Sequence, residues 1–193
     1  MNRELRLFLR AAVTFLLMLA TTSCASVPHI PRLLGRATVD YSAVPRDALQ
    51  QAADLIEKIV AEGRRDADLS DVAGITVNTP EILQAIRTRA ARIDLVNAML
   101  DSGFDYEQNN GLLCLIRNSA YKRATTSRQR DQNALMVMGE NNNRWTLYEK
   151  LIEANHWPSR ALGAVQDAFH RARVAQLRPG QKYQDESGNI LTK

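Results

Sequence analysis

Residues 79–100, TPEILQAIRTRAARIDLVNAML, decide the fold class of this chain. Thr79 is suited to cap the N-terminus of a helix, and Pro80 fits the first helical position. Gly103 follows as a helix terminator. Apolar residues recur at steps of three and four, which is typical of an amphipathic helix: Ile82, Leu83, Ile86, Ala90, Ile93, Val96 and Leu100. The stretch therefore predicts a long helix with one buried face.

Three arginines of this helix, Arg87, Arg89 and Arg92, lie mostly off the apolar stripe. We interpret them as a solvated face. The alternative is a patch that binds lipid headgroups or an acidic partner.

Further helical patterns flank this stretch on both sides. Arg46–Arg65 has the same spacing of apolar residues and ends at Gly63. A third helical stretch begins near Gln129 and carries Leu135, Met136 and Met138, with Trp145 and Tyr148 following at helical spacing. Gly139 and residues 141–143 are expected to kink or split this helix. Ser159 is expected to cap a final helix that ends at Pro179-Gly180. The buried residues of that final helix are predicted to be Leu162, Val165, Phe169 and Ala172. The predicted fold is mainly α, with four to five helices.

The segments between these helices predict turns and short strands. Residues 104–111 are turn-rich, and Asn110-Gly111 is a strong turn dipeptide. Leu112–Ile116 reads as a short buried strand or as the start of a short helix, and Lys122–Arg130 as an exposed loop. Residues 183–192 predict a C-terminal β-hairpin. Because two strands alone are marginally stable, we expect the hairpin to pair with, or pack against, Leu112–Ile116.

The N-terminus has the order of a bacterial export signal. Basic residues (Arg3, Arg6 and Arg10) precede the apolar run Ala11–Ala20, and small residues lead to Cys24. The apolar run is about ten residues long, whereas a spanning helix needs roughly 20. We predict a signal peptide over residues 1–23 and lipid modification of Cys24, which would carry palmitate-type acyl chains and tether the protein to a membrane.

Cleavage after Ala25 is the alternative, because Thr21 stands where lipoprotein signals have a large aliphatic residue. That cut would release a soluble periplasmic protein. Residues 24–45 are rich in Pro, Ser and Thr and predict a tether, and residues 46–193 a single helical domain. Ala25 and Ser26 lack the aspartate that retains some lipoproteins at the inner membrane, which favours the outer membrane.

Composition gives little support for an anionic partner. The chain has 25 Lys and Arg against 21 Asp and Glu, and removal of residues 1–23 leaves 22 against 20. This balance, together with export, argues against nucleic-acid binding. If Cys24 is acylated, Cys114 has no internal disulfide partner; it lies in an apolar run and is interpreted as a buried thiol.

Catalytic and metal-binding patterns are not found in the sequence. His29, His156 and His170 do not have metal-ligand spacing, and no cofactor is predicted. The aspartates at 66, 68 and 71 are interpreted as helix caps and solvated charge, because the pattern lacks the glycine and glutamate of a calcium loop. An acid pair of Asp105 and Glu107 is an alternative that the residues leave open. Trp145, Tyr148 and Trp157 are interpreted as core packing, with an exposed binding rim as the alternative.

The C-terminal half resembles a known family. Asn141-Asn142-Asn143-Arg144 leads into Tyr148-Glu149-Lys150-Leu151-Ile152 and Asn155, and Pro179-Gly180-Gln181-Lys182-Tyr183-Gln184 precedes Gly188 and Lys193; Asn109–Leu113 matches an upstream Gly-Leu stretch. This pattern is similar to the YdbL-like family of small exported bacterial proteins. The likeness covers about residues 80–193. The ending departs from the pattern, since Ile190 and Leu191 stand where an aromatic residue is usual.

The resemblance implies an accessory role in the cell envelope. Members of this family are similar to exported accessory proteins associated with large AsmA-like proteins, which are thought to bridge the envelope for lipid transport, and the family has no assigned catalytic residues. The motif positions are therefore expected to be structural or partner-binding: Asn143 and Arg144 would cap and pin a helix, and Tyr183 and Gln184 would hold the hairpin onto the helices.

The sequence thus predicts a non-enzymatic, membrane-tethered protein that binds envelope proteins. The alternatives are an envelope hydrolase with an unrecognised site and a passive structural lipoprotein. A polar pocket with a perturbed carboxyl would favour the hydrolase, and an apolar groove would favour binding. The oligomeric state is left open.

Overall fold

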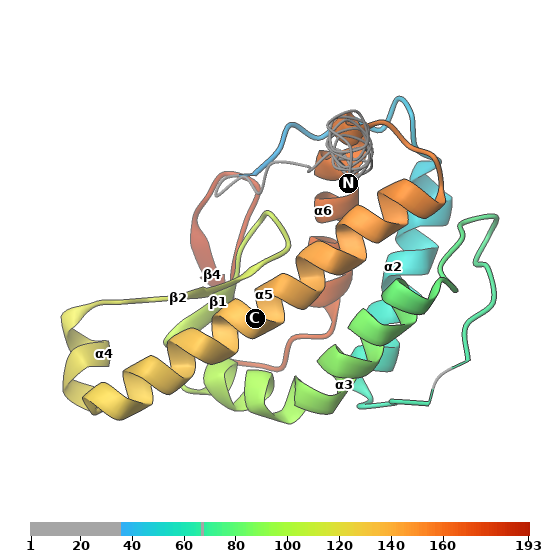
Figure 1. The fold of residues 1–193 in the computed structure, drawn as a ribbon. Helices are drawn as coiled ribbons and strands as arrows, with labels where there is room; N and C mark the ends of the chain where they lie inside the picture. Colours follow the sequence, from blue (N-terminus) through green and yellow to red (C-terminus); the bar gives the residue numbers. More distant parts are fainter. Residues whose placement is uncertain (1–35, 67) are drawn as a thin grey trace, which may run out of the picture. The chain divides into compact units, whose positions relative to one another are not determined.

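Four of the helices pack around a common centre in the computed structural model, which describes residues 36–66 and 68–193. They are α2 (Arg46–Ala61), α3 (Pro80–Asp101), α5 (Ser127–Ala154) and α6 (Leu162–Ala175). Helix α3 lies against α2 and α5, and α6 lies against α2 and α5 (Figure 1). The mainly α fold is confirmed. Within the described residues, no helix has both the length and the hydropathy needed to span a bilayer.

Helix α3 forms as the sequence predicts. The Thr79 side chain accepts a hydrogen bond from the N–H of Ile82 at 3.4 Å, and Pro80 is the first helical residue. Ile82, Ile86 and Leu100 are almost fully buried. Arg87 is exposed and Arg92 half-exposed, but Arg89 is 1% exposed, so the prediction of a solvated face is wrong for Arg89.

Helix α5 is unbroken over 28 residues, so the predicted kink near Gly139 is not found. The asparagines are accommodated because their amides find partners. Asn141 donates to the carbonyl of Leu113 and accepts from its N–H, and Asn143 donates to the carbonyl of Gly139 at 2.8 Å. At Gly139, an added Cβ would lie 3.1 Å from a guanidinium nitrogen of Arg92, which is the end of a flexible side chain of α3.

The expected loop over Lys122–Arg130 is largely helical. A short helix, α4 (Ser119–Ala124), begins after Asn118, whose side chain accepts from the N–H of Tyr121. Helix α5 then starts with a capping box, in which Thr126 and Gln129 bond reciprocally. A final 3₁₀ turn, η1 (Ser159–Ala161), precedes α6, so Ser159 does not cap α6 directly.

A four-stranded sheet covers one side of the helices, with strand order β2-β1-β3-β4. The strands are β1 (Asp105–Glu107), β2 (Leu113–Leu115), β3 (Lys182–Gln184) and β4 (Ile190–Thr192). The C-terminal hairpin β3–β4 is confirmed. It joins the sheet through a parallel pairing of β3 with β1, whereas Leu112–Ile116 was the predicted neighbour. Strand β1, which lies in a stretch predicted as turn, separates β2 from the hairpin.

Residues 36–45, part of the predicted tether, lie against α6 in the structure. The Arg36 guanidinium and the Tyr41 hydroxyl each donate to Asp167 at 2.7 Å. A Cβ at Gly163 would come within 2.0 Å of the carbonyl oxygen of Thr38, so only glycine permits this approach. The predicted signal peptide, Cys24 and His29 lie outside the described residues.

Candidate functional site

Arg144 is the centre of a charged cluster in the interior. Its guanidinium donates to the Glu140 carboxylate at 2.7 Å and to both Glu107 oxygens at 2.5 and 3.2 Å. It also reaches the carbonyl of Gly111 at 3.2 Å. Its side chain is 1% exposed. Helix α5 is thereby joined to β1 and to the turn that follows β1.

Three further residues extend the cluster to the remaining helices. Arg89 of α3 binds both oxygens of Glu57 of α2, at 2.6 and 2.9 Å, and Glu140 at 2.9 Å. Arg173 of α6 donates to Glu107 at 2.8 Å. We call this set the buried ion network; its members are Glu57, Arg89, Glu107, Glu140, Arg144 and Arg173. Three carboxylates face three guanidinium groups, so the formal charge is zero.

Four members of the network stay ionised despite burial: Arg89, Glu107, Glu140 and Arg144. Desolvation would raise the pKa of Glu107, but Arg144 and Arg173 outweigh it and lower that pKa to about 2. Burial acts likewise on Glu140, and Arg89 and Arg144 lower its pKa to about 2. The pKa values of the Arg89 and Arg144 guanidinium groups are raised, because their carboxylate partners outweigh desolvation. Glu107, Glu140, Arg89 and Arg144 are therefore fixed charges that do not exchange protons near neutral pH.

Asp105 lies close to the network but takes no part in its ion pairs. Both of its carboxylate oxygens are buried without a hydrogen bond among the described residues, and the residue is 1% exposed. Burial, and then the nearby charge of Glu107, raise its pKa to about 7. Asp105 and Glu107 alternate with Tyr106 on β1 and so share a face of the sheet. The acid pair left open by the sequence is thus brought together, with Glu107 already engaged by two arginines.

The motif residues of the α5 half have structural contacts. Tyr148 is buried, its hydroxyl donates to the carbonyl of Gly111 at 2.7 Å, and its ring packs on Phe169 with centroids 5.2 Å apart. Trp145 is buried beside it, and Trp157 is half-buried. Arg144 pins α5 to β1 in the way expected. Asn143 lies in the middle of α5 and bonds its own helix, so it does not cap a helix.

The C-terminal motif residues shape the hairpin. Gly180, after Pro179, adopts a positive φ of 91°, and its N–H donates to the carbonyl of Lys193. Tyr183 packs against a buried cluster that includes Val96, Leu100 and Leu113, which agrees with its expected role. The Gln184 side chain instead binds the N–H of Asn109 and the carbonyl of Gly188, both outside the helices.

The remaining candidate groups do not converge. His170 is buried on α6, where desolvation lowers its pKa, and His156 is exposed with a φ of 54° just after α5. Cys114 is half-buried on β2, opposite Tyr106. Among residues 36–66 and 68–193, no group of three or more His, Cys, Asp or Glu is placed to hold a metal ion.

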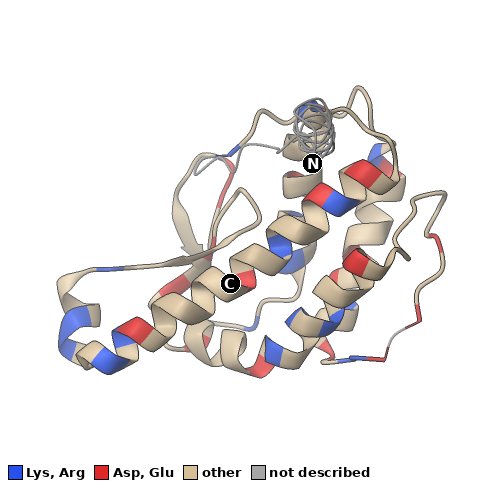
Figure 2. Ribbon diagram, in the orientation of Figure 1, with Lys and Arg blue, Asp and Glu red and all other residues tan. Residues whose placement is uncertain are grey.

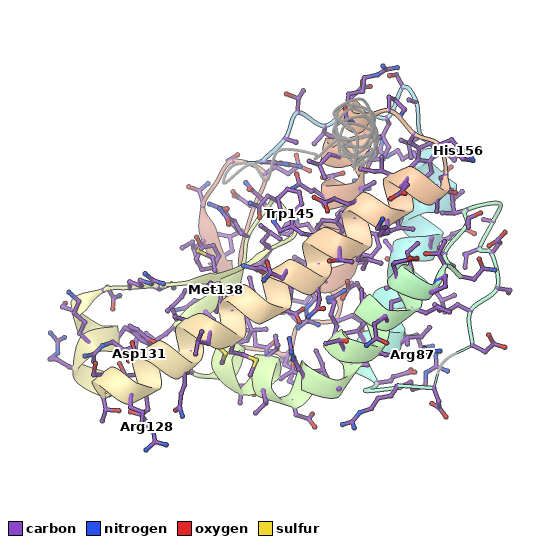
Figure 3. The ribbon with its side chains drawn as sticks, in the orientation of Figure 1. Arg87, Arg128, Asp131, Met138, Trp145 and His156 are labelled. Atoms are coloured by element: carbon purple, nitrogen blue, oxygen red, sulfur yellow. The ribbon has the colours of Figure 1, made fainter. Side chains whose placement is uncertain are left out.

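An apolar hollow lies on the surface between α5 and β2, with a volume of about 410 Å³. We call it the α5–β2 hollow. Its apolar lining comes from Leu112, Leu113, Leu115, Val137, Met138 and Trp145, and Arg117 stands among the lining residues. Met138 is 61% exposed, and Figure 3 shows it on α5 with Trp145 further along the helix. An apolar groove is the surface feature expected of a protein that binds a partner.

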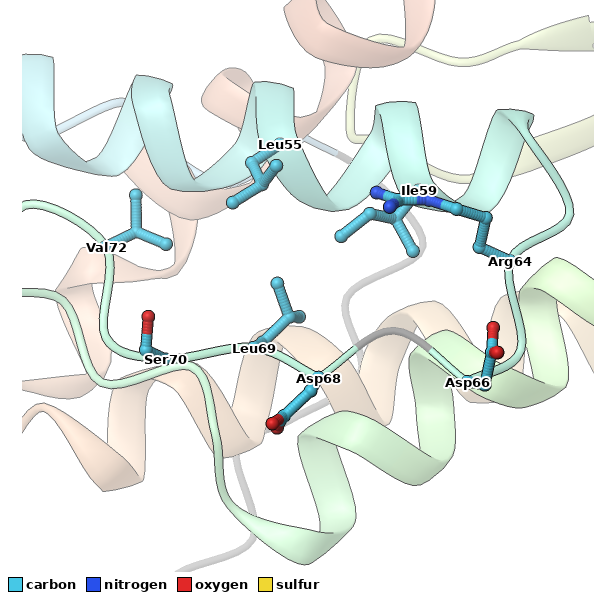
Figure 4. Close-up of a pocket in the computed structure, with 8 residues that line it drawn as sticks. All are labelled: Leu55, Ile59, Arg64, Asp66, Asp68, Leu69, Ser70 and Val72. Atoms are coloured by element: carbon cyan, nitrogen blue, oxygen red, sulfur yellow. The ribbon is translucent and has the colours of Figure 1, made fainter.

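A second hollow of about 550 Å³ lies between α2 and residues 64–72 (Figure 4). Leu55, Ile59 and Leu69 point toward one another in it, while Asp68 points away. Asp66, Asp68 and Asp71 are exposed, as predicted for solvated charge, but none of them caps α2 or α3.

The buried ion network as a whole was missed from the sequence, although Arg144 and Glu107 had been named for other reasons and a signal was present for Arg89. Arg89 follows Ile86 by three residues and precedes Ile93 by four, so it continues the buried stripe. Comparison with known proteins adds nothing to this geometry: no family model matches the chain, and no curated protein or solved structure is significantly similar to it.

Proposed function

We propose that this protein is a lipid-anchored accessory protein of the bacterial cell envelope, whose helical domain binds an envelope protein and catalyses no reaction. The observation that carries the proposal is a contrast in chemistry. The arginines and glutamates of the buried ion network are paired and closed off from solvent. The α5–β2 hollow, in contrast, is apolar, lies beside the exposed Met138 and is open at the surface. A domain of this kind has a surface for a partner.

The partner is proposed to be a protein that places apolar side chains in the α5–β2 hollow. The hollow is walled by side chains on one side and by a strand on the other, and its volume admits a few residues rather than a large cofactor. By the resemblance described above, components similar to AsmA-like lipid-transport proteins are the first partners to test. Attachment through an acylated Cys24 would hold the domain near them.

A photoreactive amino acid at Met138 tests this binding in living cells. Leu95 of α3 is a matched control, because its side chain is 54% exposed against 61% for Met138. We expect one envelope protein, identified by mass spectrometry, to crosslink at Met138 and not at Leu95. Equal crosslinking at both positions, or none at Met138, would contradict the proposal.

The lipid anchor has an independent test. Mass spectrometry of the mature protein should find an acylated cysteine at position 24, and a Cys24→Ala variant should lack the acyl chains. An unmodified N-terminus at Ser26 would instead support the soluble periplasmic alternative.

An envelope hydrolase is the second candidate, and Asp105 is the observation that favours it. A carboxyl with a pKa raised to about 7 is suited to general acid–base work at neutral pH. Its 1% exposure leaves a substrate no access in this structure. Loss of envelope function in an Asp105→Asn variant that keeps its crosslink at Met138 would favour the hydrolase.

A further inference from the structure

One end of the domain concentrates positive charge. Residues 117–138 carry five Lys and Arg and one acid, a formal charge of +4, whereas all of residues 36–193 carry 21 and 20, a formal charge of +1. Arg117, Lys122, Arg123 and Arg128 are exposed, and no acidic group of the described residues lies within ion-pair distance of them. Figure 2 shows basic positions on α4, at the start of α5 and in the segment that leads from β2 into α4.

These cations stand on a well-supported piece of structure. Arg130 donates to the carbonyl of Thr125 at 2.5 Å, which joins the α4–α5 connection to α5. Asn133 of α5 donates to the hydroxyl of Tyr121 of α4 at 3.1 Å, and the Tyr121 ring packs on Phe104 with centroids 5.4 Å apart. Lys122, Arg123 and Arg128 are thus carried by two helices that these contacts join together.

Apolar side chains continue this charged surface along α5. Leu135 is 68% exposed and follows Arg128 by seven residues, which places both on one face of the helix. Met138 lies one turn further on, and Figure 3 shows Arg128, Asp131 and Met138 in sequence along α5. Exposed leucine beside clustered cations matches a surface with negative charge above an apolar interior.

We propose that this end of the domain binds the surface of an anionic phospholipid bilayer. We call it the α4–α5 end and define it by Arg117, Lys122, Arg123, Arg128 and Leu135. The cations meet lipid phosphates while Leu135 enters the boundary between headgroups and acyl chains. The contact goes beyond the proposed function: it is a second attachment, made by the folded domain, which fixes the orientation of the domain relative to the membrane.

Vesicle flotation tests the proposal with the full chain carrying Cys24→Ala, so that no acyl group is attached at residue 24. The probes are vesicles of phosphatidylcholine alone and an equimolar mixture of phosphatidylcholine and phosphatidylglycerol. Neutral vesicles measure what the N-terminal apolar run contributes, and the paired variants below, which all keep Arg3, Arg6 and Arg10, separate the α4–α5 end from the basic N-terminus. We expect tighter binding to the anionic vesicles, weakening as salt is raised. Equal binding to the two vesicle types would overturn the proposal.

Paired variants then locate the contact. Arg123→Gln with Arg128→Gln should weaken binding to anionic vesicles by roughly 10- to 30-fold, since each basic residue near such a surface contributes about five-fold. Arg65→Gln with Arg87→Gln removes two exposed cations elsewhere and should change it less than about two-fold. Equal losses in the two pairs would show general charge attraction and would refute a contact at the α4–α5 end.

Leucine substitutions test the apolar part of the contact. Leu135→Ser should weaken binding by about five-fold, and Leu95→Ser, at a similarly exposed position on α3, should leave it unchanged. All these positions are exposed, so the variants should keep the thermal unfolding midpoint of the parent. Because no protein partner is present, failure here would leave the proposed function untouched.

Discussion

The centre of the bundle and the α4–α5 end both contain clustered arginines, yet they use them in opposite ways. In the centre, each guanidinium faces carboxylates at hydrogen-bonding distance and is closed to solvent. At the α4–α5 end, exposed cations meet no acid of the described residues at ion-pair distance. The difference teaches that position decides the role of arginine: paired burial joins elements, and unpaired exposure leaves charge available for a partner.

Arg144→Met tests the buried ion network, and of the changes considered it should have the largest effect on stability. It leaves Glu107 with Arg173 alone and Glu140 with Arg89 alone, both still buried. We expect a loss of about 3–5 kcal/mol in the free energy of unfolding, measured by denaturant titration. That is a large part of the roughly 5–15 kcal/mol total of a typical domain. A loss below about 1 kcal/mol would show that the network does not hold the bundle together.

Asp105→Asn should change the pH dependence of stability. The pKa of Asp105 is raised from 3.8 to about 7, so the folded state binds more protons than the unfolded state between these values. Stability from this group is therefore fully present below about pH 4 and is lost as pH rises to 7. The variant removes that loss, and we expect it to be more stable than the parent at pH 8 by about 3 kcal/mol.

The same titration has an acid limb that the variant should keep. Glu107 and Glu140 have pKa values lowered from 4.5 to about 2, so their contribution is present above pH 4.5 and lost as pH falls toward 2. The parent should thus be most stable between about pH 4 and 5. Urea denaturation measured from about pH 2 to pH 8 follows both limbs. If the stability of parent and Asp105→Asn falls equally between about pH 4 and 7, the raised pKa assigned to Asp105 is wrong.

Gly163→Ala tests whether residues 36–45 stay packed against α6 in solution. The added Cβ would meet the Thr38 carbonyl, so the segment must move away from α6. We expect a loss of about 1–3 kcal/mol and faster proteolysis at Arg36. Unchanged proteolysis would mean that the segment is already detached in solution.

Arg178→Gln should have the smallest effect. Arg178 pairs with Asp101 at 3.2 Å, and both side chains are about half exposed, at 56% and 46%. We expect a change below about 1 kcal/mol, because solvent screens such pairs. The same denaturant titration checks it, and a loss as large as that of Arg144→Met would break the contrast between buried and exposed pairs.

The helices could be predicted because apolar spacing and capping residues are local signals. Thr79 with Pro80 located the start of α3, and Gly63 closely followed the end of α2. The predicted kink in α5 was wrong because asparagine side chains often compete with the helix backbone and favour turns. In the folded chain, the amide of Asn141 instead bonds Leu113 of β2, and that of Asn143 bonds the carbonyl of Gly139. Strand β1 was missed because three residues carry no periodicity.

The site was harder to predict than the fold for a related reason. A buried arginine looks like a surface arginine until its carboxylate partners are known, and the partners of Arg144 stand 37 and 4 residues away in the chain. Asp105 and Glu107 of β1 were singled out as a pair. The difference between their environments comes from Arg144 of α5 and Arg173 of α6, which pair with Glu107 alone.

The two hydrogen bonds between Asn141 and Leu113 have a consequence for self-association. β2 is an outer strand of the sheet, and the N–H and carbonyl of Leu113 would otherwise be open to a strand from another molecule. The amide of Asn141 imitates a peptide group and occupies both positions, at 2.9 Å each. The Asn141 side chain thus takes the place of a fifth strand. It protects the β2 edge of the sheet against pairing with a strand of another molecule, and so against aggregation.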